Sequence, residues 1–265
     1  MRYKLGFIGC GNMAQAIAGG AIKGGVLQAS DVIASDPSAS NRAVFEGWGC
    51  GVSELNGDVV AQAQQVLLAV KPQVFPVVAA DLDAITDDQV LISIMAGISS
   101  AGVTKHVGRP CRVVRVMPNT PALVGAGMAG IAMGDGARPG DDELSKRLFA
   151  AVGEVVCLKE PMIDAINAIS GSGPGYVFYF AEALEDAAAE LGLGGAARRV
   201  IAQTFFGAGK LMLESGEGPA ELRGKVTSPG GTTLAATDSF DHDRVKEAIR
   251  KAVRAAFTRA QELGA

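Results

Sequence analysis

The stretch that decides the fold is Tyr3-Lys-Leu-Gly-Phe-Ile-Gly-Cys-Gly-Asn-Met-Ala14, near the start of the chain. A short apolar run, typical of a buried strand, leads directly into G-x-G-x-x-A and then into a helical segment up to Gly24. Strand, glycine loop and helix in this order are typical of a dinucleotide-binding turn. Gly9 permits the tight turn, Gly11 lets the backbone approach a pyrophosphate, and Ala14 lets the helix pack on the strand. The first N–H groups of the helix would then face the phosphates.

Length and composition restrict the class of protein. The 265 residues suffice for one large domain or two small ones, and 48% hydrophobic residues predict a buried core. With 5% aromatic residues and 35 glycines, that core should be aliphatic and closely packed. A net charge of −4 disfavours nucleic-acid binding, and we expect no membrane span because no long uncharged apolar run occurs. The first predicted strand leaves no room for a signal peptide, so we expect a cytoplasmic protein.

The cysteines give no sign of a metal site. None of the four belongs to a C-x-x-C pair, and the sequence has only two histidines. We therefore expect no metal, and interpret the cysteines as small hydrophobic residues in a reducing compartment. They are Cys10, Cys50, Cys111 and Cys157.

Strand and helix patterns alternate through the first 160 residues. This β-α-β pattern predicts an α/β fold, an N-terminal Rossmann dinucleotide-binding domain over residues 1–160 with a parallel sheet. Because several of the apolar runs are continuous, the strands should be covered on both faces. The expected strands are 3–8, 32–36, 51–53, 65–70, 90–95, 112–117, 128–133 and 154–158.

Convincing strand patterns end near Pro161. Residues 162–191 are Ala-rich and helical, with an interruption at Gly171-Ser-Gly-Pro174, and further helices are expected at 195–215 and 243–263. Residues 161–265 should therefore form a C-terminal all-α domain. Its apolar content is high for so few helices, which favours a dimerisation domain that buries this surface against a second copy. Packing on the first domain is the alternative.

Ligands of open α/β sheets bind beyond the carboxyl ends of the strands, so the residues that follow each strand are the candidate site. Ser35 and Asp36 follow the second strand. Asp36 would accept hydrogen bonds from the ribose hydroxyls and repel a 2′-phosphate, which favours NAD, whereas Arg42 could neutralise such a phosphate. Alternatively, Asp36-Pro37 is only a turn. Preference between NADH and NADPH stays open on these residues.

Two further loops should line the same cleft. Ala69-Val70-Lys71-Pro72 follows the fourth strand, where Pro72 can start a helix and Lys71 is either a phosphate contact or a solvated lysine. The segment Met117-Pro-Asn-Thr-Pro121 follows a later strand. Its two prolines make a stiff loop, suited to holding a nicotinamide ring or simply to forming a structural turn.

A second glycine-rich loop, Val226-Thr-Ser-Pro-Gly-Gly-Thr-Thr233, lies in the helical half and leads into a helix expected at Leu234. Such a loop before a helix N-terminus can bind an anion. Because the first domain would hold the dinucleotide, this second site suggests a substrate with a carboxylate. An inter-helix loop with a threonine cap is the alternative.

Taken together, these motifs make the chain resemble pyrroline-5-carboxylate reductase along nearly its whole length. The glycine loop is shared with many dehydrogenases, whereas the loop that ends at Thr233 is the most specific. The motifs are Phe7-Ile-Gly-Cys-Gly-Asn-Met-Ala14, Ala69-Val-Lys-Pro72, Ser93-Ile-Met-Ala-Gly97, Arg115-Val-Met-Pro-Asn-Thr-Pro-Ala122, Ile169-Ser-Gly-Ser-Gly-Pro174 and Thr227-Ser-Pro-Gly-Gly-Thr-Thr233.

The resemblance implies reduction of Δ1-pyrroline-5-carboxylate to L-proline with NADPH or NADH, in a homodimer or an oligomer of dimers. It implies that Ser228, Gly231, Thr232 and Thr233 bind the substrate, with Thr233 donating a hydrogen bond to the ring nitrogen as the catalytic residue. Asp36 departs from many members, which carry a neutral residue there. The implied cofactor-binding residues are Gly9, Cys10, Gly11, Asn12, Met13, Ser35, Asp36, Asn56, Ala69, Val70, Lys71, Pro72, Ala96, Pro118 and Asn119.

The scarcity of histidine suits this reaction, since a protonated imine brings its own proton and needs less acid catalysis than a ketone. A β-hydroxyacid dehydrogenase is one alternative. Aligning its inter-domain motif on Gly171 and Gly173, however, places Val177 and Ala181 where its catalytic Lys and Asn would stand. A non-catalytic NAD(P)-sensing protein is the other alternative.

Overall fold

The computed structural model describes residues 1–134 and 136–263. The chain forms two compact units, one made of residues 1–174 with the segment from Ala256 on, the other of Gly175–Ala255. The domain boundary after residue 160 stays a prediction, and residues 264 and 265 of the predicted second domain lie outside the described residues.

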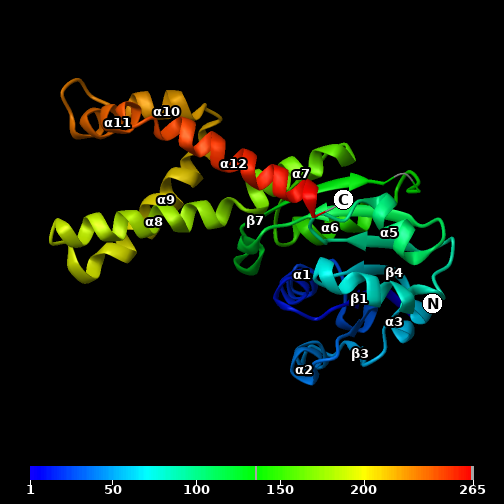
Figure 1. Ribbon diagram of the computed structural model, residues 1–265. Coiled ribbons are helices and arrows are strands. Elements are labelled where there is room, and N and C mark those ends of the chain that lie inside the picture. The colour runs from blue at the N-terminus through cyan, green and yellow to red at the C-terminus, as the bar shows by residue number, and fades with distance from the viewer. Residues whose placement is uncertain (135, 264–265) are drawn as a thin grey trace. The chain divides into compact units, whose positions relative to one another are not determined.

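The first unit contains one eight-stranded sheet of order β3-β2-β1-β4-β5-β6-β7-β8 (Figure 1). The first six strands run parallel. Because the strand order reverses between β1 and β4, their carboxyl ends mark the point where such sheets bind ligands. The predicted α/β Rossmann arrangement is thus confirmed. The strands are β1 Tyr3–Ile8, β2 Val32–Ser35, β3 Gly51–Ser53, β4 Ala63–Leu68, β5 Val90–Ser93, β6 Arg112–Met117, β7 Gly127–Met133 and β8 Gly153–Cys157.

The prediction of a fully parallel sheet is wrong at one strand pair. β7 runs antiparallel to β6, and β8 then runs parallel to β7. The connection from β6 to β7 contains only a short 3-10 turn at Thr120–Val124. It is too short for the crossover that a parallel neighbour requires.

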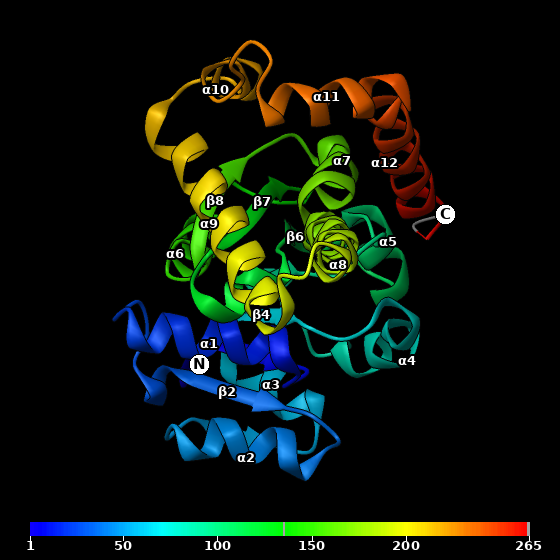
Figure 2. The same cartoon turned by 90° about the vertical axis from the view of Figure 1, so that its left-hand side faces the viewer.

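Helices cover both faces of the sheet (Figures 1 and 2). α1, α2 and α6 contribute to the core on one face, and α3, α4 and α5 to the core on the other. This double cover explains why β2 and β5 are buried at every position. The helices of this unit are α1 Asn12–Lys23, α2 Ala39–Gly47, α3 Asn56–Gln62, α4 Phe75–Ala79, α5 Ser100–Val107, α6 Glu143–Ala150 and α7 Ile163–Ile166.

The predicted interruption of the next helical run occurs. After α7 the backbone is π-helical over Asn167–Gly171, and α8 begins at Gly173. Pro174 thereby falls in the first turn of α8, where its missing N–H leaves no helical hydrogen bond unmade.

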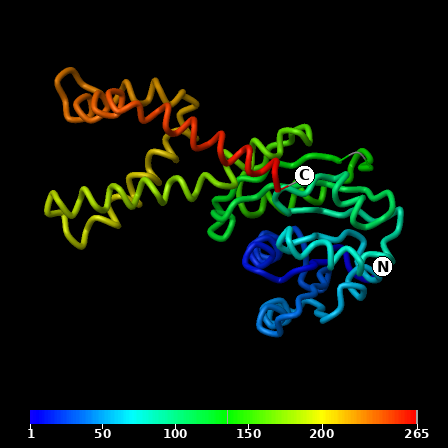
Figure 3. The backbone as a smooth tube through the Cα atoms, viewed as in Figure 1, coloured from blue at the N-terminus to red at the C-terminus, as the bar shows by residue number. Residues whose placement is uncertain are grey.

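The second unit is helical, as the composition after Pro161 predicts (Figure 3). Ala188 of α8 packs with Ala197 and Ile201 of α9 in its small buried cluster. Two short helices, α10 and α11, occupy the stretch where the sequence predicted only a helix from Leu234. Among the described residues, no helix combines the length and apolar character needed to cross a membrane. The helices are α8 Gly173–Glu190, α9 Ala197–Ser215, α10 Pro219–Lys225, α11 Thr232–His242 and α12 Val245–Glu262.

Candidate active site

The glycine loop after β1 is pressed against the loop after β4. Gly9 has a φ of +96°, and a Cβ atom there would lie 2.7 Å from the carbonyl oxygen of Ala69. Only glycine tolerates both conditions. The amide of Ala69 donates to the carbonyl of Ile8 at 2.8 Å. The predicted cleft residues Gly9 and Ala69 are therefore neighbours at the switch point of the sheet.

Gly11 is the N-cap of α1 and has extended backbone. A Cβ atom added to it would meet no atom within 4 Å, so the space beside the loop is open. No side chain in the described part of the protein caps this helix. The first-turn amides, which include those of Asn12 and Met13, therefore carry the positive end of the helix dipole without a side-chain cap. These features fit a pyrophosphate group.

Asp36 links the glycine loop to the turn after β2. Its Oδ2 accepts from the Cys10 amide at 2.8 Å, and its Oδ1 accepts from the Ser38 amide at 2.8 Å. The Asn41 side-chain amide donates to the same Oδ1 at 3.2 Å. Asp36 is only 9% exposed. Three N–H donors therefore hold this carboxylate, which fixes the loop and leaves little of it to face a ribose.

Ser35 and Asn56 join the ends of β2 and α3. The Ser35 hydroxyl donates to Oδ1 of Asn56 at 2.7 Å, and the Asn56 side-chain amide donates to Asp81 at 2.8 Å. The structure thus brings Asn56 to the edge of the sheet where Ser35 and Asp36 lie. Its distance in sequence from Ser35 hides this contact, which comes from the parallel pairing of β2 with β3.

The thiol of Cys10 is buried within this loop. Its Sγ donates to the carbonyl of Ser35 at 3.4 Å, and the residue is fully buried. Burial, and secondarily the Asp36 charge, raise the pKa of the Cys10 thiol to about 12. Cys10 therefore contributes backbone groups to the site, as its position in the loop indicates.

The other predicted cleft residues lie at the same carboxyl-terminal edge. Lys71 is exposed and precedes a 3-10 turn that Pro72 begins, with the Val74 amide donating to the Lys71 carbonyl at 2.9 Å. Val70 is half-buried. Ala96, also half-buried, follows β5 in a turn with Gly97, whose φ is +77°.

Asn119, after Pro118, holds the loop that follows β6. Its Oδ1 accepts from the Met128 amide at 2.9 Å, and its Nδ2 donates to the carbonyl and hydroxyl of Ser170 at 3.2 and 3.1 Å. The side chain of Asn119 thus links this loop to β7 and to the π-helical segment Asn167–Gly171. The partner Ser170 is 51 residues away and was not predicted from sequence.

The predicted substrate loop lies in the helical unit. Gly230 has a φ of +69°, the Gly231 amide donates to the Ser228 carbonyl at 3.0 Å, and Gly231 is the N-cap of α11. The helix therefore begins at Thr232, two residues before the predicted start, and no described side chain caps it. Ser228 and Thr232 are exposed and Thr233 is half-buried. The loop offers amides and hydroxyls to an anion, and its threonines are not caps.

Two side chains that contact the glycine loop and the turn after β2 were not predicted from the sequence. Gln15 donates from Nε2 to the Cys10 carbonyl at 2.8 Å, one turn into α1. Glu54 forms an ion pair with Arg42 across the turn after β2. No local motif marks either residue, because each contact depends on how the loops meet.

The Rossmann sheet and the uncapped helix after the glycine loop place the chain in the class of dinucleotide-binding proteins. Comparison with known proteins agrees. A model described as pyrroline-5-carboxylate reductase dimerisation matches residues 160–263, and one described as NADP oxidoreductase coenzyme F420-dependent matches residues 4–97. The pyrroline-5-carboxylate reductase of Pseudomonas aeruginosa is 42% identical over 264 residues, 98% of this chain and 96% of that protein.

Solved structures agree along the whole chain. The chain resembles the structure of a pyrroline-5-carboxylate reductase from Coxiella burnetii with a TM-score of 0.90 and 35% identity, covering 100% of both chains. A Plasmodium falciparum pyrroline carboxylate reductase with NADP bound gives a TM-score of 0.89 at 28% identity, covering 99% and 98%. This chain belongs to the pyrroline-5-carboxylate reductase family, as the sequence motifs predicted.

Proposed function

We propose that the chain reduces Δ1-pyrroline-5-carboxylate to L-proline, the last step of proline biosynthesis, by hydride transfer from NAD(P)H. The observation that carries the proposal is the Ser228–Thr233 loop, which leads into the uncapped start of α11. A second anion-binding turn, separate from the dinucleotide loop, suits the carboxylate of this substrate. The full-length family membership supports the same reaction.

The residues of the loop would divide the recognition of the substrate. Ser228, Gly231 and Thr232 would bind the carboxylate through hydroxyl and amide groups, while the Thr233 hydroxyl would donate to the ring nitrogen. Thr233 is half-buried, which shields such a hydrogen bond from water. The chain needs no acid here, because the imine is already protonated and becomes a neutral amine.

The dinucleotide supplies the hydride when it is bound. The first-turn amides of α1 would hold its pyrophosphate, and the turns that carry Asp36 and Asn56 would border its adenosine ribose. Ala69, Lys71, Ala96 and Pro118 follow strands β4, β5 and β6 and would line the rest of the cleft. Positioning of this kind is the main contribution that the protein makes to a hydride transfer.

The same proposal includes a homodimer or an oligomer of dimers, formed through residues 161–265. The helical unit leaves large apolar side chains exposed, among them Phe178, Tyr179, Phe206 and Leu213. Apolar surface on this scale is typical of an interface. A cytoplasmic location belongs to the proposal too, since the four cysteines are free thiols, the state expected in a reducing compartment.

The decisive experiment is a steady-state assay of the full chain with pyrroline-5-carboxylate and either NADH or NADPH. Oxidation of the cofactor should depend on the imine, and proline should form in equal amount. Tight cofactor binding without turnover would instead favour an NAD(P)-sensing protein. A β-hydroxyacid dehydrogenase is disfavoured by Val177 and Ala181, so no turnover is expected with β-hydroxyacids.

A further inference from the structure

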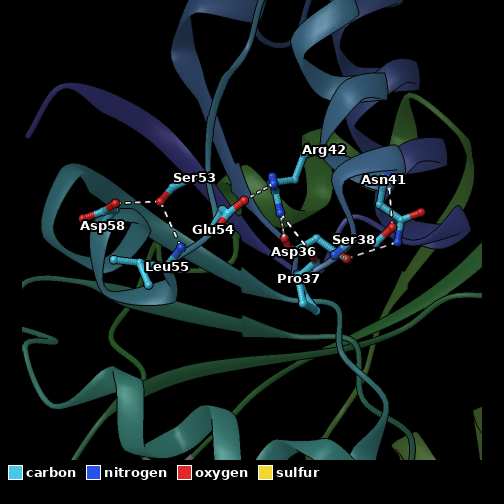
Figure 4. Close-up of polar contacts among 9 residues, drawn as sticks. All are labelled: Asp36, Pro37, Ser38, Asn41, Arg42, Ser53, Glu54, Leu55 and Asp58. Atoms are coloured by element: carbon cyan, nitrogen blue, oxygen red, sulfur yellow. Dashed lines mark hydrogen bonds and ion pairs between the residues drawn. The ribbon is translucent and has the colours of Figure 1, made fainter.

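Arg42 of α2 is held in place by three groups of the turn and loop beside it. Its Nη1 donates to the carbonyls of Asp36 at 2.7 Å and Pro37 at 3.2 Å, and its Nη2 pairs with the carboxylate of Glu54 (Figure 4). The Arg42 side chain is 13% exposed, whereas that of Glu54 is 75% exposed. Two backbone carbonyls therefore fix the guanidinium through Nη1. The Glu54 carboxylate occupies Nη2, the outer nitrogen, from the solvent side.

A local turn fixes the loop that carries Glu54. The Ser53 hydroxyl accepts from the Leu55 amide at 3.0 Å and donates to Asp58 at 2.6 Å (Figure 4). These contacts hold the backbone on both sides of Glu54. The course of the β3–α3 loop therefore places Glu54 beside Arg42, and the ion pair itself holds the exposed Glu54 side chain there.

The position of Arg42 bears on the 2′ position of a bound adenosine. In Rossmann domains an acidic residue after the second strand reads the ribose hydroxyls, or a nearby arginine accepts a 2′-phosphate. Here three N–H donors already hold the Asp36 carboxylate. Arg42, the cation of residues 36–42, is then a group that can attract a 2′-phosphate.

We propose that Glu54 is a specificity-determining residue that disfavours the 2′-phosphorylated cofactor by occupying the outer nitrogen of Arg42. A 2′-phosphate would have to displace this carboxylate and would also be repelled by its charge. NADH, which has a hydroxyl at that position, meets neither obstacle. The inference rests on the proposed function only through the bound dinucleotide and involves no substrate contact.

The test measures binding of two adenosine fragments to the full chain by calorimetry. Adenosine 2′,5′-bisphosphate carries the 2′-phosphate, and 5′-AMP lacks it. Because the Glu54 carboxylate is largely exposed and such ion pairs are weak, Glu54→Gln should tighten the binding of the bisphosphate about three- to fivefold. The affinity for 5′-AMP should stay within about twofold. Added salt should shrink the gain.

Two variants serve as controls. Glu46→Gln removes the same charge from an exposed position on α2 and should change neither affinity. In an Arg42→Gln background the effect of Glu54→Gln should become smaller, because the guanidinium that the carboxylate occupies is gone. The ratio of kcat/KM for NADPH to that for NADH should rise in Glu54→Gln by the same factor as the bisphosphate affinity.

An unchanged affinity for the bisphosphate in Glu54→Gln, or an equal gain for 5′-AMP, would overturn the inference. So would a failure of the unaltered chain to bind either fragment. If both fragments bind as expected but pyrroline-5-carboxylate is not reduced, the proposed function fails while the role of Glu54 stands.

Discussion

The amide of Cys10 and the carboxylate of Asp36 are 26 positions apart in sequence and form a hydrogen bond of 2.8 Å. Through it the residue after β2 holds the glycine loop after β1. Asp36 also accepts from Ser38 and Asn41, so it connects the two loops that would enclose the pyrophosphate and the ribose. Its main task in this structure is to support the loop.

Asp36→Ser should therefore weaken the binding of NADH and NADPH alike. A hydrogen bond to a charged group contributes about 1.5–3 kcal/mol, and the short serine side chain cannot make all three contacts. We expect a lower melting temperature and a loss of affinity for both cofactors, measured by fluorescence titration. Asp36→Asn, which keeps the shape, should lose less.

If Asp36 instead contacts the ribose, Asp36→Ser should change the cofactor affinities in a different way. A selective gain for NADPH, with NADH affinity retained, would mean that Asp36 reads the ribose directly, as the sequence suggested. The melting temperature separates the two cases, because a supporting residue lowers it and a residue facing only the ligand does not.

Gly9 and Gly11 give a matched pair of substitutions in one loop. Gly11→Val should abolish cofactor binding while costing only about 1 kcal/mol or less of stability, since the added side chain enters open space at an N-cap. Gly9→Ala should chiefly destabilise the fold, because alanine at positive φ costs about 1–2 kcal/mol and its Cβ would meet Ala69.

Thermal melts and cofactor titrations of both glycine variants check this. Normal NADH binding by Gly11→Val would contradict the pyrophosphate assignment of the α1 N-terminus. Equal stability of Gly9→Ala and the unaltered chain would show that the loop is not pressed against Ala69 in solution.

Thr233→Ala should lower turnover with pyrroline-5-carboxylate by about 10- to 100-fold, the cost of one lost hydrogen bond of about 1.4–2.7 kcal/mol in the transition state. Cofactor affinity should be unchanged, because Thr233 belongs to the loop in the helical unit. Thr233→Ser, which retains the hydroxyl, should recover most of the rate. A collapse of cofactor affinity in Thr233→Ala would remove this residue from the substrate site.

The sequence predicted the strands well because fully buried strands leave continuous apolar runs, as in β2 and β5. The glycines of the loop after β1 were predicted equally well from the sequence, since few residues can replace Gly9 at its positive φ. The direction of β7 was predicted wrongly, because an apolar run has the same composition in either direction. Only the short connection after Met117 determines it.

The candidate site was predicted where it is local and missed where it depends on contacts between loops. Asp36 was recognised by its place after β2, but its donor Cys10 lies 26 residues away on the glycine loop. Asn119 was recognised for its stiff loop, whereas its partner Ser170 belongs to the π-helical segment. Glu54 carries no motif at all, and only the pairing of β3 with β2 brings it to Arg42.

The cysteines should differ sharply in reactivity in the folded protein. Burial raises the pKa of the Cys10 thiol to about 12 and that of Cys50 to about 11, and both side chains are inaccessible, whereas Cys157 is exposed. At pH 8 iodoacetamide should modify Cys157 first and leave Cys10 and Cys50 unmodified until the chain is unfolded. Mass spectrometry of peptides from native and denatured samples would measure this, and early labelling of Cys10 would contradict the buried loop.

The raised pKa of the Cys10 thiol also makes the free energy of unfolding depend on pH. The folded state keeps the thiol protonated up to about pH 12, while the unfolded chain releases the proton from about pH 9. This contribution to the free energy of unfolding is therefore complete below pH 9 and is lost as the pH rises toward 12.

The variant Cys10→Ser tests this, because serine does not ionise in this range and can still donate to the carbonyl of Ser35. We expect the free energy of unfolding, measured with urea, to fall less from pH 8 to pH 10 in Cys10→Ser than in the unaltered chain. An equal fall in both proteins would show that the Cys10 thiol is not buried in solution.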